Sequence, residues 1–599
     1  MSEGALLEVE NLRVEYGGRG AVDGVSFALG RGRCLGVIGE SGAGKSQSFL
    51  ALMGLLPRKA RVSGEARLAG VSLLSPEGTN LRGRDVAMIF QDPMTSLTPH
   101  LSIGDQVAEP LVQHRGMSWD DARGQAARLL EEVRMTDVPR RLEQYPHELS
   151  GGMRQRAMIA MALACDPALL IADEPTTALD VSVQAQILGL LRSIVDARGA
   201  ALAVITHDMG VIAALADDVL VMRAGSIVER GSVAHILKSP DHEYTRGLLA
   251  ATPRIDAPGA SAPTESPSGE TPLVVRDVHV HHAVRSGGWR RRRGTLAAVD
   301  GVGFEIAAGE ALGIVGESGS GKSTLTRALL RLLPVARGEI VWLGRPIQDL
   351  GGEELRQARA GFQIVFQDPF ASLDPRMRVA DIVAEPLVAL RPELSTSERA
   401  DRVAAMLARV GLGAEYAGRR SRELSGGQCQ RVAIARAMIL EPKLLVCDEA
   451  VSALDVSIQA QVLELLESIK REQGTSIIFV SHNLAVVRQL CERILVMYLG
   501  REVESGATDA VFRAPRHPYT RLLLDSVPSV DPVAGRARLA NLGPRDEMPS
   551  AFQRPEGCAF RSRCPAALPT CAARSPEPED AGEARKVACL RWRELVNQP

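Results

Sequence analysis

CLGVIGESGAGKSQS, at residues 34–48, sets the architecture of this chain, and ALGIVGESGSGKSTL repeats it at 311–325. In each copy a five-residue apolar run, typical of a buried strand, ends at a glycine-rich loop. Apolar side chains then recur at helical spacing: Phe49, Leu52, Met53 and Leu56. Four further apolar runs end at polar residues: LLIAD (169–173), LAVIT (202–206), LLVCD (444–448) and IIFVS (477–481). This alternation predicts an α/β fold with a parallel sheet and its chemistry at the strand ends.

The chain is duplicated well beyond this loop. Three further segments occur twice, in the same order and at a near-constant offset: IFQDPMTSL (89–97) and VFQDPFASL (365–373), ELSGGMRQR (148–156) and ELSGGQCQR (423–431), HEYTRGLL (242–249) and HPYTRLLL (517–524). A constant offset indicates two copies of one domain rather than scattered short matches.

We therefore expect two domains, at 1–251 and 273–530, joined by a linker at 252–272 and followed by an extension at 531–599. The linker is rich in Pro, Ala, Ser and Gly and has too little large apolar surface to fold. Within the first domain the stretch 100–148 is mostly helical and amphipathic in pattern. It predicts a helical insertion in each α/β core.

Composition excludes several classes of protein. The 599 residues carry 70 Lys+Arg against 72 Asp+Glu, so no global basic field favours nucleic acid. The N-terminus MSEGALLEVE lacks the basic start of a signal peptide, and no uncharged apolar run approaches the roughly 18 residues of a membrane span. We expect a chain that neither spans a membrane nor is exported by this route. Nine cysteines without an export signal indicate a reducing compartment, where disulfides are not expected.

The glycine-rich loops match the phosphate-loop pattern in the strand–loop–helix context that its chemistry requires. The matching residues are Gly39, Gly44, Lys45 and Ser46 in the first copy and Gly316, Gly321, Lys322 and Ser323 in the second. Backbone N–H groups converge on phosphate oxygens, the lysine reaches the outer phosphates and the serine hydroxyl binds Mg²⁺. A simple glycine-rich turn is the alternative, but two copies in register make that interpretation improbable.

Each copy also carries an acidic pair at the end of an apolar strand, at Asp173-Glu174 and Asp448-Glu449. The aspartate suits an Mg²⁺ site, and the glutamate can orient and deprotonate an attacking water. A single such pair could be a solvated strand end. Two pairs, each following a phosphate loop, predict a phosphate-loop hydrolase.

The phrases LSGGM (149–153) and LSGGQ (424–428), shortly before the acidic strands, resemble the signature of ATP-binding-cassette proteins, and QDPMTSL and QDPFASL resemble its peptide-importer branch. The chain resembles a fused pair of the two ATPase subunits of an oligopeptide/dipeptide-type (peptide/nickel) ABC importer. The resemblance implies two tandem nucleotide-binding domains, each a RecA-like core with a helical subdomain, and a small cysteine-containing extension. It also implies ATP hydrolysis coupled to transport.

The family's residue roles carry over to matching positions. Implied catalytic residues are Glu174, Glu449, the switch histidines His207 and His482, and the Q-loop glutamines Gln91 and Gln367. Implied Mg²⁺ ligands are Ser46, Gln91, Asp173, Ser323, Gln367 and Asp448. Implied ATP-binding residues are Tyr16, Gly39, Ser41, Gly42, Gly44, Lys45, Ser46, Gln47, Gly316, Ser318, Gly319, Gly321, Lys322, Ser323, Thr324, Ser150, Gly151, Gly152, Ser425, Gly426, Gly427, Gln428, Asp180 and Asp455. Tyr16 resembles the aromatic that stacks on adenine, whereas its counterpart in the second copy is His282.

The resemblance further implies that the signature of one copy completes the ATP site of the other, so that ATP closes the pair and hydrolysis opens it. Both sites keep the residues for hydrolysis. The implied partners are two integral membrane permease subunits and, indirectly, an extracytoplasmic solute-binding protein, at the cytoplasmic face of the bacterial inner membrane, with no nucleic acid. A tandem-cassette ATPase acting on ribosomes or nucleic acid is the alternative, but the short Pro-rich linker and the C-terminal cysteines argue against it.

Four cysteines cluster near the C-terminus, at Cys558, Cys564, Cys571 and Cys589. Their spacing departs from the paired CxxC of zinc ribbons. Four thiolates could bind Zn²⁺ or an iron–sulfur cluster, and the third alternative is a small structural tail with free thiols. The resemblance to the extension of peptide-importer ATPases implies a [4Fe–4S] cluster. The other five cysteines lie mostly in apolar runs and are expected to be core thiols.

A basic run, Trp-Arg-Arg-Arg-Arg at 289–293, lies in a stretch of the second copy that is longer than its equivalent in the first. It could contact anionic lipid or a nucleotide phosphate, but a solvated loop is the favoured interpretation.

Overall fold

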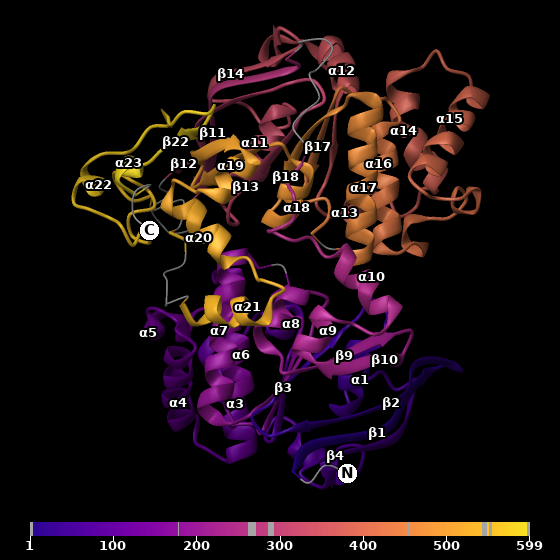
Figure 1. The fold of residues 1–599 in the computed structure, drawn as a ribbon, viewed down its shortest axis with the longest axis vertical. Helices are drawn as coiled ribbons and strands as arrows, with labels where there is room; N and C mark the ends of the chain where they lie inside the picture. The colour runs from indigo at the N-terminus through magenta and orange to yellow at the C-terminus, as the bar shows by residue number, and fades with distance from the viewer. Residues whose placement is uncertain are drawn as a thin grey trace. The chain divides into compact units, whose positions relative to one another are not determined.

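The computed structural model describes residues 4–177, 179–260, 271–285, 293–452, 454–541, 548–549 and 554–595. These residues form two compact units. The first comprises 1–252, 455–457 and 528–544, and the second comprises 253–454, 458–527 and 545–599. Figure 1 labels many of the helices and strands of both.

The first unit contains two sheets. The core sheet has the order β10-β9-β3-β8-β7-β6, parallel except for its edge strand β10. Its strands are β3 (Cys34–Ile38), β6 (Val86–Ile89), β7 (Leu169–Asp173), β8 (Ala201–Ile205), β9 (Asp218–Arg223) and β10 (Ser226–Ser232). The second sheet is antiparallel, with the order β2-β1-β4-β5, and consists of β1 (Ala5–Tyr16), β2 (Arg19–Gly30), β4 (Ala60–Leu68) and β5 (Val71–Ser72).

Both faces of the core sheet are covered, which is why its strands are continuous apolar runs rather than alternating ones. Successive side chains of β3 point to opposite faces. Leu35 and Val37 pack with the antiparallel sheet in one hydrophobic cluster, whereas Cys34 and Ile38 pack with helices in another. Strand β7 is buried along its whole length, and Asp173 is its last residue.

The helices of the first unit follow the strands or form an insertion between β6 and β7. The insertion contains α2 (Pro93–Ser96), α3 (Ile103–Arg115), α4 (Trp119–Glu132), α5 (Val138–Glu143) and α6 (Gly151–Leu163). The other helices are α1 (Lys45–Leu52), α7 (Val181–Arg198), α8 (Met209–Leu215), α9 (Val233–Lys238) and α10 (Glu243–Ala251), with 3₁₀ turns at η1 (Pro76–Leu81) and η2 (Pro146–Glu148).

The second unit repeats this plan and extends it. Its core sheet has the order β16-β17-β18-β13-β19-β20-β22-β21, in which the last two strands come from the C-terminal extension. The core strands are β13 (Ala311–Val315), β16 (Phe362–Val365), β17 (Leu444–Asp448), β18 (Ser476–Val480), β19 (Arg493–Tyr498), β20 (Arg501–Ala507), β21 (Glu579–Asp580) and β22 (Lys586–Val587). The antiparallel sheet consists of β11 (Leu273–Arg285), β12 (Arg293–Ile306), β14 (Arg337–Trp342) and β15 (Arg345–Pro346).

The helices of the second unit follow the same order. Those of the insertion are α13 (Pro369–Ser372), α14 (Val379–Leu390), α15 (Thr396–Arg409) and α16 (Gly426–Met438), with 3₁₀ turns η4 (Ala414–Tyr416) and η5 (Ser421–Glu423). Figure 1 shows α14, α15 and α16 side by side. The rest are α11 (Lys322–Leu329), η3 (Ile347–Asp349), α12 (Gly352–Gly361), α17 (Val456–Gln473), α18 (Leu484–Leu490), α19 (Thr508–Arg513), α20 (Pro518–Ser526), α22 (Thr570–Ala573) and α23 (Trp592–Leu595).

The segment after the second core divides between the two units. Helix α21 (Pro532–Asn541) belongs to the first unit, where Val530 and Leu539 pack against the hydrophobic core. Residues 545–599, which carry the clustered cysteines, belong to the second. The expected extension at 531–599 is therefore divided between the two units.

The predicted fold class, two tandem α/β domains with helical subdomains, is confirmed. Four predicted strands have the observed bounds of β3, β7, β13 and β17: 34–38, 169–173, 311–315 and 444–448. The other two predictions, 202–206 and 477–481, begin and end one residue later than β8 and β18. Of the linker, 261–270 lies outside the described residues, and so does the basic run 289–293 apart from Arg293, where β12 begins. Among the helices that the structure describes, none combines the length and apolar character needed to cross a membrane.

Candidate functional site

The phosphate loops are shaped by glycines that no other residue could replace without strain. Gly39 has φ +152°, and a Cβ there would lie 2.2 Å from the carbonyl oxygen of Met222. Gly316 has φ +151°, and its Cβ would lie 2.3 Å from that of Met497. Each loop therefore packs directly on a neighbouring strand of its sheet and opens the following helix, α1 or α11, at the lysine.

Both lysines fold back onto their own loop. Lys45 Nζ donates to the carbonyl oxygens of Gly39 at 2.7 Å and Glu40 at 2.9 Å. Lys322 Nζ donates to those of Gly316 at 2.8 Å and Glu317 at 3.0 Å. Burial lowers the pKa of Lys45, against the opposing effect of the carboxylates of Glu174 and Asp173. The ammonium groups are thus held over the loop, where an incoming phosphate would meet them.

A serine–aspartate pair closes the floor of each site. Ser46 Oγ donates to Asp173 Oδ1 at 2.9 Å, and Ser323 Oγ donates to Asp448 Oδ1 at 3.0 Å. Burial raises the pKa of Asp173 to about 6, although the Ser46 hydrogen bond opposes the shift. Hydroxyl and carboxylate oxygens side by side are the donor set that Mg²⁺ prefers, so these residues fit the ion.

Glu174 is the centre of the first site. Gln91 Nε2 and Thr177 Oγ1 donate to its Oε2 at 2.7 and 2.9 Å, and His207 Nδ1 lies 3.2 Å from its Oε1. Burial alone would raise the pKa of Glu174, but His207, Thr177 and Lys45 together outweigh burial and lower the pKa overall. The same pairing raises the pKa of His207 against the effect of burial. The carboxylate is therefore ionised and oriented, as a general base must be.

The second site repeats this arrangement with one looser contact. Gln367 Nε2 donates to Glu449 Oε2 at 2.7 Å, whereas His482 Nδ1 lies 3.6 Å from Glu449 Oε1. Burial would raise the pKa of Glu449, but the nearby His482 and Lys322 together outweigh burial and lower the pKa overall. Ser452 occupies the place of Thr177, but its Oγ donates to the backbone oxygen of Glu449 at 3.0 Å instead of the carboxylate.

The backbone at both glutamates is left-handed, with φ +46° at Glu174 and φ +50° at Glu449. Non-glycine residues rarely adopt this conformation, and where they do the strain often belongs to a functional site. The N–H of Glu174 donates to Ile205 at 2.8 Å and that of Glu449 to Val480 at 3.0 Å, which ties each strained residue to the neighbouring strand.

The aromatic residue expected to stack on adenine is half-buried at the end of β1. The hydroxyl of Tyr16 donates to Gln47 Oε1, so it is joined to the helix after the loop. His282 takes the corresponding place in β11. Of the other implied loop residues, Ser41 and Gly42 are in the first phosphate loop, Ser318 and Gly319 in the second, and Thr324 in α11.

The signature segments lie in the helical insertions, at helix N-termini. Ser150 Oγ accepts the N–H of Met153 at 3.2 Å to cap α6, and Ser425 Oγ accepts that of Gln428 at 3.3 Å to cap α16. Gln428 also accepts the N–H of Ser425, which completes a capping box that Met153 cannot form. The glycines that follow in each signature are Gly151, Gly152, Gly426 and Gly427. Asp180 and Asp455 directly precede α7 and α17.

Two tyrosines outside the predicted site residues also contact the phosphate loops. The hydroxyl of Tyr244 accepts the N–H of Glu40 at 3.0 Å, and that of Tyr519 accepts the N–H of Glu317 at 2.9 Å. Their signal in the sequence is the repeated HxYTR segment, which by itself indicates duplication and not a role at the loop.

The four clustered cysteines converge on one part of the extension. The N–H of Cys558 donates to the backbone oxygen of Cys571 at 2.7 Å. Burial raises the pKa of Cys589 to about 11, and the thiols of Cys558, Cys564 and Cys571 add to the shift. A tetrahedral zinc site, with Zn–S bonds of about 2.3 Å, would place its sulfurs about 3.8 Å apart. Among the described residues, three ligand-type atoms within 4.8 Å of one another occur at Glu229, His235 and Asp241, and not among these thiols. Among the described residues, the four thiols are therefore not gathered as closely as the ligands of a zinc tetrahedron.

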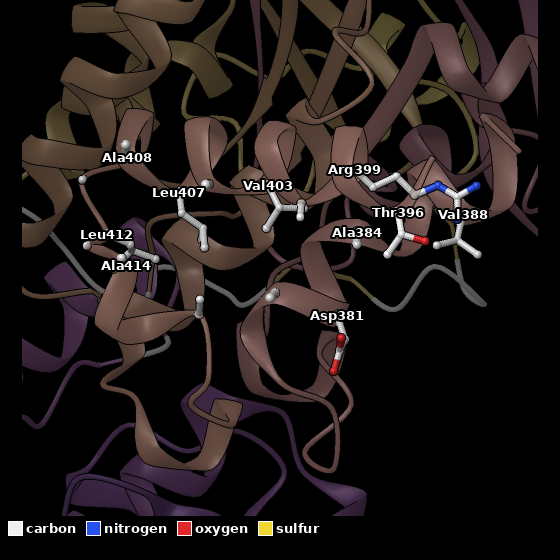
Figure 2. A pocket seen from close by; sticks show the side chains of 16 residues that line it. Asp381, Ala384, Val388, Thr396, Arg399, Val403, Leu407, Ala408, Leu412 and Ala414 are labelled. Carbon is white, nitrogen blue, oxygen red and sulfur yellow. The ribbon is translucent and has the colours of Figure 1, made fainter. Parts of the chain in front are cut away.

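An apolar groove of about 760 Å³ lies between α14 and α15 in the second unit. Figure 2 shows Val403 and Leu407 along one side, with Asp381 and Arg399 among its polar members. The exposed fraction of Val388, also in its lining, is 55%, which is high for a large apolar side chain.

The corresponding place in the first unit is bridged by an arginine. Arg123 of α4 contacts Asp105 of α3 at 2.9 Å and Glu143 of α5 at 2.5 Å. In the second unit Ala400 occupies the position of Arg123, so no equivalent side chain reaches Asp381 from there. The two helical insertions therefore present different surfaces.

Comparison with known proteins identifies two families. The model of the ABC transporter family matches residues 22–177 and 299–452. The model of the oligopeptide/dipeptide transporter C-terminal region matches 228–277 and 503–571, so its second match includes three of the four clustered cysteines.

The similar curated proteins include the glutathione import ATP-binding protein GsiA of Escherichia coli (strain K12), 45% identical over 585 residues, which cover 92% of this chain and 93% of that protein. GsiA of Salmonella typhimurium (strain LT2) is 45% identical over 584 residues, with 91% and 93% covered. Among solved structures, the ATP-binding cassette MJ0796, a dimer in a post-hydrolysis state with ADP and phosphate, is 29% identical with a TM-score of 0.36 and covers 39% of this chain and 98% of that one.

Proposed function

The chain belongs to the ABC transporter family as an ATP-binding importer subunit of its oligopeptide/dipeptide branch, and from this membership we propose that its two halves hydrolyse ATP to drive uptake of a peptide-type solute. The observation that carries the proposal is the convergence, in each unit, of a loop lysine, a serine–aspartate pair and a glutamate held by glutamine and histidine. Family membership also implies membrane permease partners.

The chemistry assigned to each half is water attack on the outer phosphate of ATP. Lys45 and Lys322 bind the phosphates, and Glu174 and Glu449 accept the proton of the attacking water. Ser46 with Asp173, and Ser323 with Asp448, would hold Mg²⁺, with Gln91 and Gln367 nearby; the ion would neutralise phosphate charge. His207 would orient Glu174, and both His207 and His482 would contact the outer phosphate.

The signatures complete these sites in the proposed cycle. Ser150 and Ser425 lie at helix N-termini, where a serine hydroxyl and backbone N–H groups are suited to bind a phosphate. In this proposal the signature of each half binds the nucleotide held by the other half, so that ATP favours a closed pair and hydrolysis an open one. Two different permease subunits at the cytoplasmic face of a bacterial inner membrane would receive this motion, and a solute-binding protein would deliver the cargo.

The groove of the second unit is the proposed docking place for a short amphipathic helix of one permease subunit. Its apolar lining and the exposed Val388 would be covered by such a helix, and Asp381 would select a basic residue on it. Val388→Asp should reduce the amount of permease that copurifies and leave the basal ATPase rate unchanged. An amount of copurified permease that Val388→Asp leaves unchanged would reject the groove as the docking place.

Cys558, Cys564, Cys571 and Cys589 would hold a [4Fe–4S] cluster, which would cross-link the extension through four thiolates. The support for this assignment is the clustering of four cysteines in a segment that matches the oligopeptide/dipeptide transporter C-terminal region for three of them. Anaerobic purification followed by assays of iron, acid-labile sulfide and zinc tests this assignment. Stoichiometric zinc, or a metal-free folded chain, would reject it.

The proposed function is tested by purifying the tagged chain in mild detergent from its native host and identifying the proteins that accompany it. Two polytopic membrane proteins, with ATPase activity that rises on adding the solute-binding protein and a ligand, are expected. Glutathione, a dipeptide and a longer peptide are the first ligands to compare, since the similar proteins are named for glutathione import. Recovery of ribosomal proteins or nucleic acid in place of permeases would reject the importer.

The hydrolytic assignment has its own test. Glu174→Gln together with Glu449→Gln should preserve ATP binding and lower turnover by at least about 100-fold, because a general base typically contributes 10²–10⁴-fold. Near-normal hydrolysis by the double variant would show that another group is the base.

A further inference from the structure

The cysteine extension reaches the phosphate loop of the second half through one arginine. Arg563, which lies between Cys558 and Cys564, forms a two-pronged ion pair with Glu317, the loop residue directly after Gly316. Its Nη1 donates to Oε2 at 2.6 Å and its Nη2 donates to Oε1 at 2.8 Å. The exposed fractions are 1% for the arginine and 3% for the glutamate, so the pair is fully buried.

Glu317 is also tied to the nucleotide-binding lysine. Its backbone oxygen accepts a hydrogen bond from Lys322 Nζ at 3.0 Å, and its N–H donates to Tyr519 at 2.9 Å. Three parts of one residue are thus held at once, by the lysine, by the tyrosine and by Arg563. Any shift of the carboxylate would move the backbone that positions the lysine.

Arg563 is itself fixed by the fold of the extension. Its N–H donates to Phe560 at 3.0 Å, and its guanidinium lies over the rings of Tyr498 and Phe560 at 5.9 and 5.8 Å. Phe560 and Tyr519 also contact each other, with ring centroids 5.4 Å apart. The turn that carries two of the four thiols is therefore packed directly behind the phosphate loop.

The rest of the extension is firmly attached to the same unit. Strand β22 adds to the core sheet beside β20, and Arg585 forms a buried ion pair with Glu504 of β20. A rigid attachment of this kind transmits a local change instead of absorbing it.

The first half has no equivalent of this link among the described residues. Glu40 takes the place of Glu317 and bonds Tyr244 and Lys45 in the same way, but it is half-buried, and no described arginine or lysine forms an ion pair with its carboxylate. Arg223, at the position of Tyr498, stacks on the Tyr244 ring at 5.0 Å. The two phosphate loops therefore differ in what holds the residue after the first glycine.

We propose that Arg563 is a positioning residue for the second ATP site, and that through it the ligand state of the clustered thiols sets nucleotide affinity at that site alone. This inference rests on the proposed function, because it takes the loop at 316–321 as an ATP site. When the thiols are ligated, the turn holds Arg563 against Glu317 and the loop stays in its binding form. When a thiol ligand is lost, the turn loosens, the buried carboxylate loses its partner and the loop shifts.

The test measures equilibrium binding of trinitrophenyl-ATP with Mg²⁺ to the full chain carrying Lys45→Ala, which leaves only the second site. Arg563→Gln should weaken binding by about 5- to 150-fold, the usual range of coupling between sites, and Arg563→Lys should recover part of the loss. In the reciprocal Lys322→Ala background, Arg563→Gln should change the affinity by less than about twofold, well below that coupling range. An unchanged affinity in the first background, or equal weakening in both, would overturn the inference.

A second set of variants addresses folding and the role of the thiols. Arg563→Met with Glu317→Leu replaces the buried pair by apolar side chains, a change that folds usually tolerate. Cys564→Ser should weaken nucleotide binding in the Lys45→Ala chain but add nothing once this apolar pair is in place. Equal weakening by Cys564→Ser in both chains would show that the thiols do not act through Arg563.

One control separates this inference from the proposed function. The Lys45→Ala, Lys322→Ala double variant should lose nucleotide binding. If it binds normally, the assignment of the ATP sites fails; if it loses binding while Arg563→Gln has no effect, only the inference about Arg563 fails.

Discussion

Thr177 and Ser452 occupy equivalent positions and hold their glutamates differently. The Thr177 hydroxyl donates to the carboxylate of Glu174, whereas the Ser452 hydroxyl donates to the backbone oxygen of Glu449. Only the first contact fixes the orientation of the group that would accept a proton. The two sites therefore depend on this position to different degrees, although both retain every residue implied in catalysis.

Thr177→Val should lower the ATPase rate by about 2- to 10-fold, because a hydrogen bond contributes about 0.5–1.5 kcal/mol. The matched Ser452→Ala should have a smaller effect, since it leaves the carboxylate contacts of Glu449 intact. Steady-state hydrolysis over a range of ATP concentrations gives both values. A larger loss with Ser452→Ala would contradict the roles assigned here.

His517 makes the second unit sensitive to acid. Its ring is buried, Nδ1 accepts the N–H of Tyr519 at 3.0 Å, and the ring is also hydrogen-bonded to the backbone of Ala588 in the extension. Glu504 is the charged group nearby, and it accepts the backbone N–H of His517. Burial lowers the pKa of His517 to about 3.

Because the pKa is lower in the folded chain than the unfolded value of about 6.5, the stabilisation is complete above pH 6.5 and is lost as pH falls from there toward 3. The free energy of unfolding should fall by up to about 1.4 kcal/mol per pH unit below 6.5 from this group. His517→Gln should remove that slope, and His242→Gln, at the equivalent place in the first unit, is the control. Urea unfolding at pH 7, 6 and 5 measures it; parallel slopes for wild type and His517→Gln would disprove the linkage.

At the scale of elements, the short helices after the switch histidines depend on their N-caps. Asp208 Oδ1 accepts the N–H groups of Gly210 at 2.7 Å and Val211 at 3.3 Å, and Gln184 donates to its other oxygen. Asn483 caps α18 through the same pattern. Each cap residue directly follows its histidine in the sequence. The cap therefore fixes the backbone from which the imidazole side chain extends.

Asp208→Ala should lower the free energy of unfolding by about 1 kcal/mol and reduce hydrolysis, because α8 loses its cap and His207 its fixed backbone. Asn483→Ala should cost less, since an uncharged cap lacks the favourable interaction of a carboxylate with the helix dipole. Chemical unfolding together with ATPase rates measures both. If Asp208→Ala destabilises the chain but leaves full ATPase activity, the cap is not needed to position His207.

At the scale of the whole molecule, helix α21 follows the second core in sequence yet belongs to the first unit. Arg536 Nη2 donates to the backbone oxygen of Ala216 at 2.6 Å and to Asp217 Oδ1 at 3.0 Å. Asp217 also accepts the N–H of Cys34, the first residue of β3. The helix thus supports the strand that leads into the first phosphate loop.

Arg536→Ala should destabilise the first unit by about 1–3 kcal/mol, because charge-assisted hydrogen bonds are lost and Asp217 is left without them. Hydrogen exchange in α8 and β3 should increase, while exchange in the second unit stays constant. Val533→Ala, at a side chain that is 74% exposed, is the neutral comparison. Unchanged exchange in α8 after Arg536→Ala would mean that α21 contributes little to this unit.

The sequence alone determined the duplicated α/β fold, the helical insertions and the residues of both phosphate loops. These are local signals: apolar runs of strand length, glycines where the backbone must turn left-handed, and polar side chains directly after a strand. Parallel strands place such tips at one edge, so Lys45, Ser46, Asp173 and Glu174 could be grouped from their positions along the chain. The one-residue displacement of LAVIT and IIFVS arose because a terminal polar residue does not mark where pairing stops.

Only the tertiary structure decided which distant residues meet. Tyr519, Arg563 and Glu317 come together from three separate segments, and α21 joins a unit far away in the sequence. A buried ion pair leaves no periodic pattern, because its two members are specified by packing across hundreds of residues and not by their neighbours. The same reason explains why the two loops, nearly identical as sequence, are held by different partners in space.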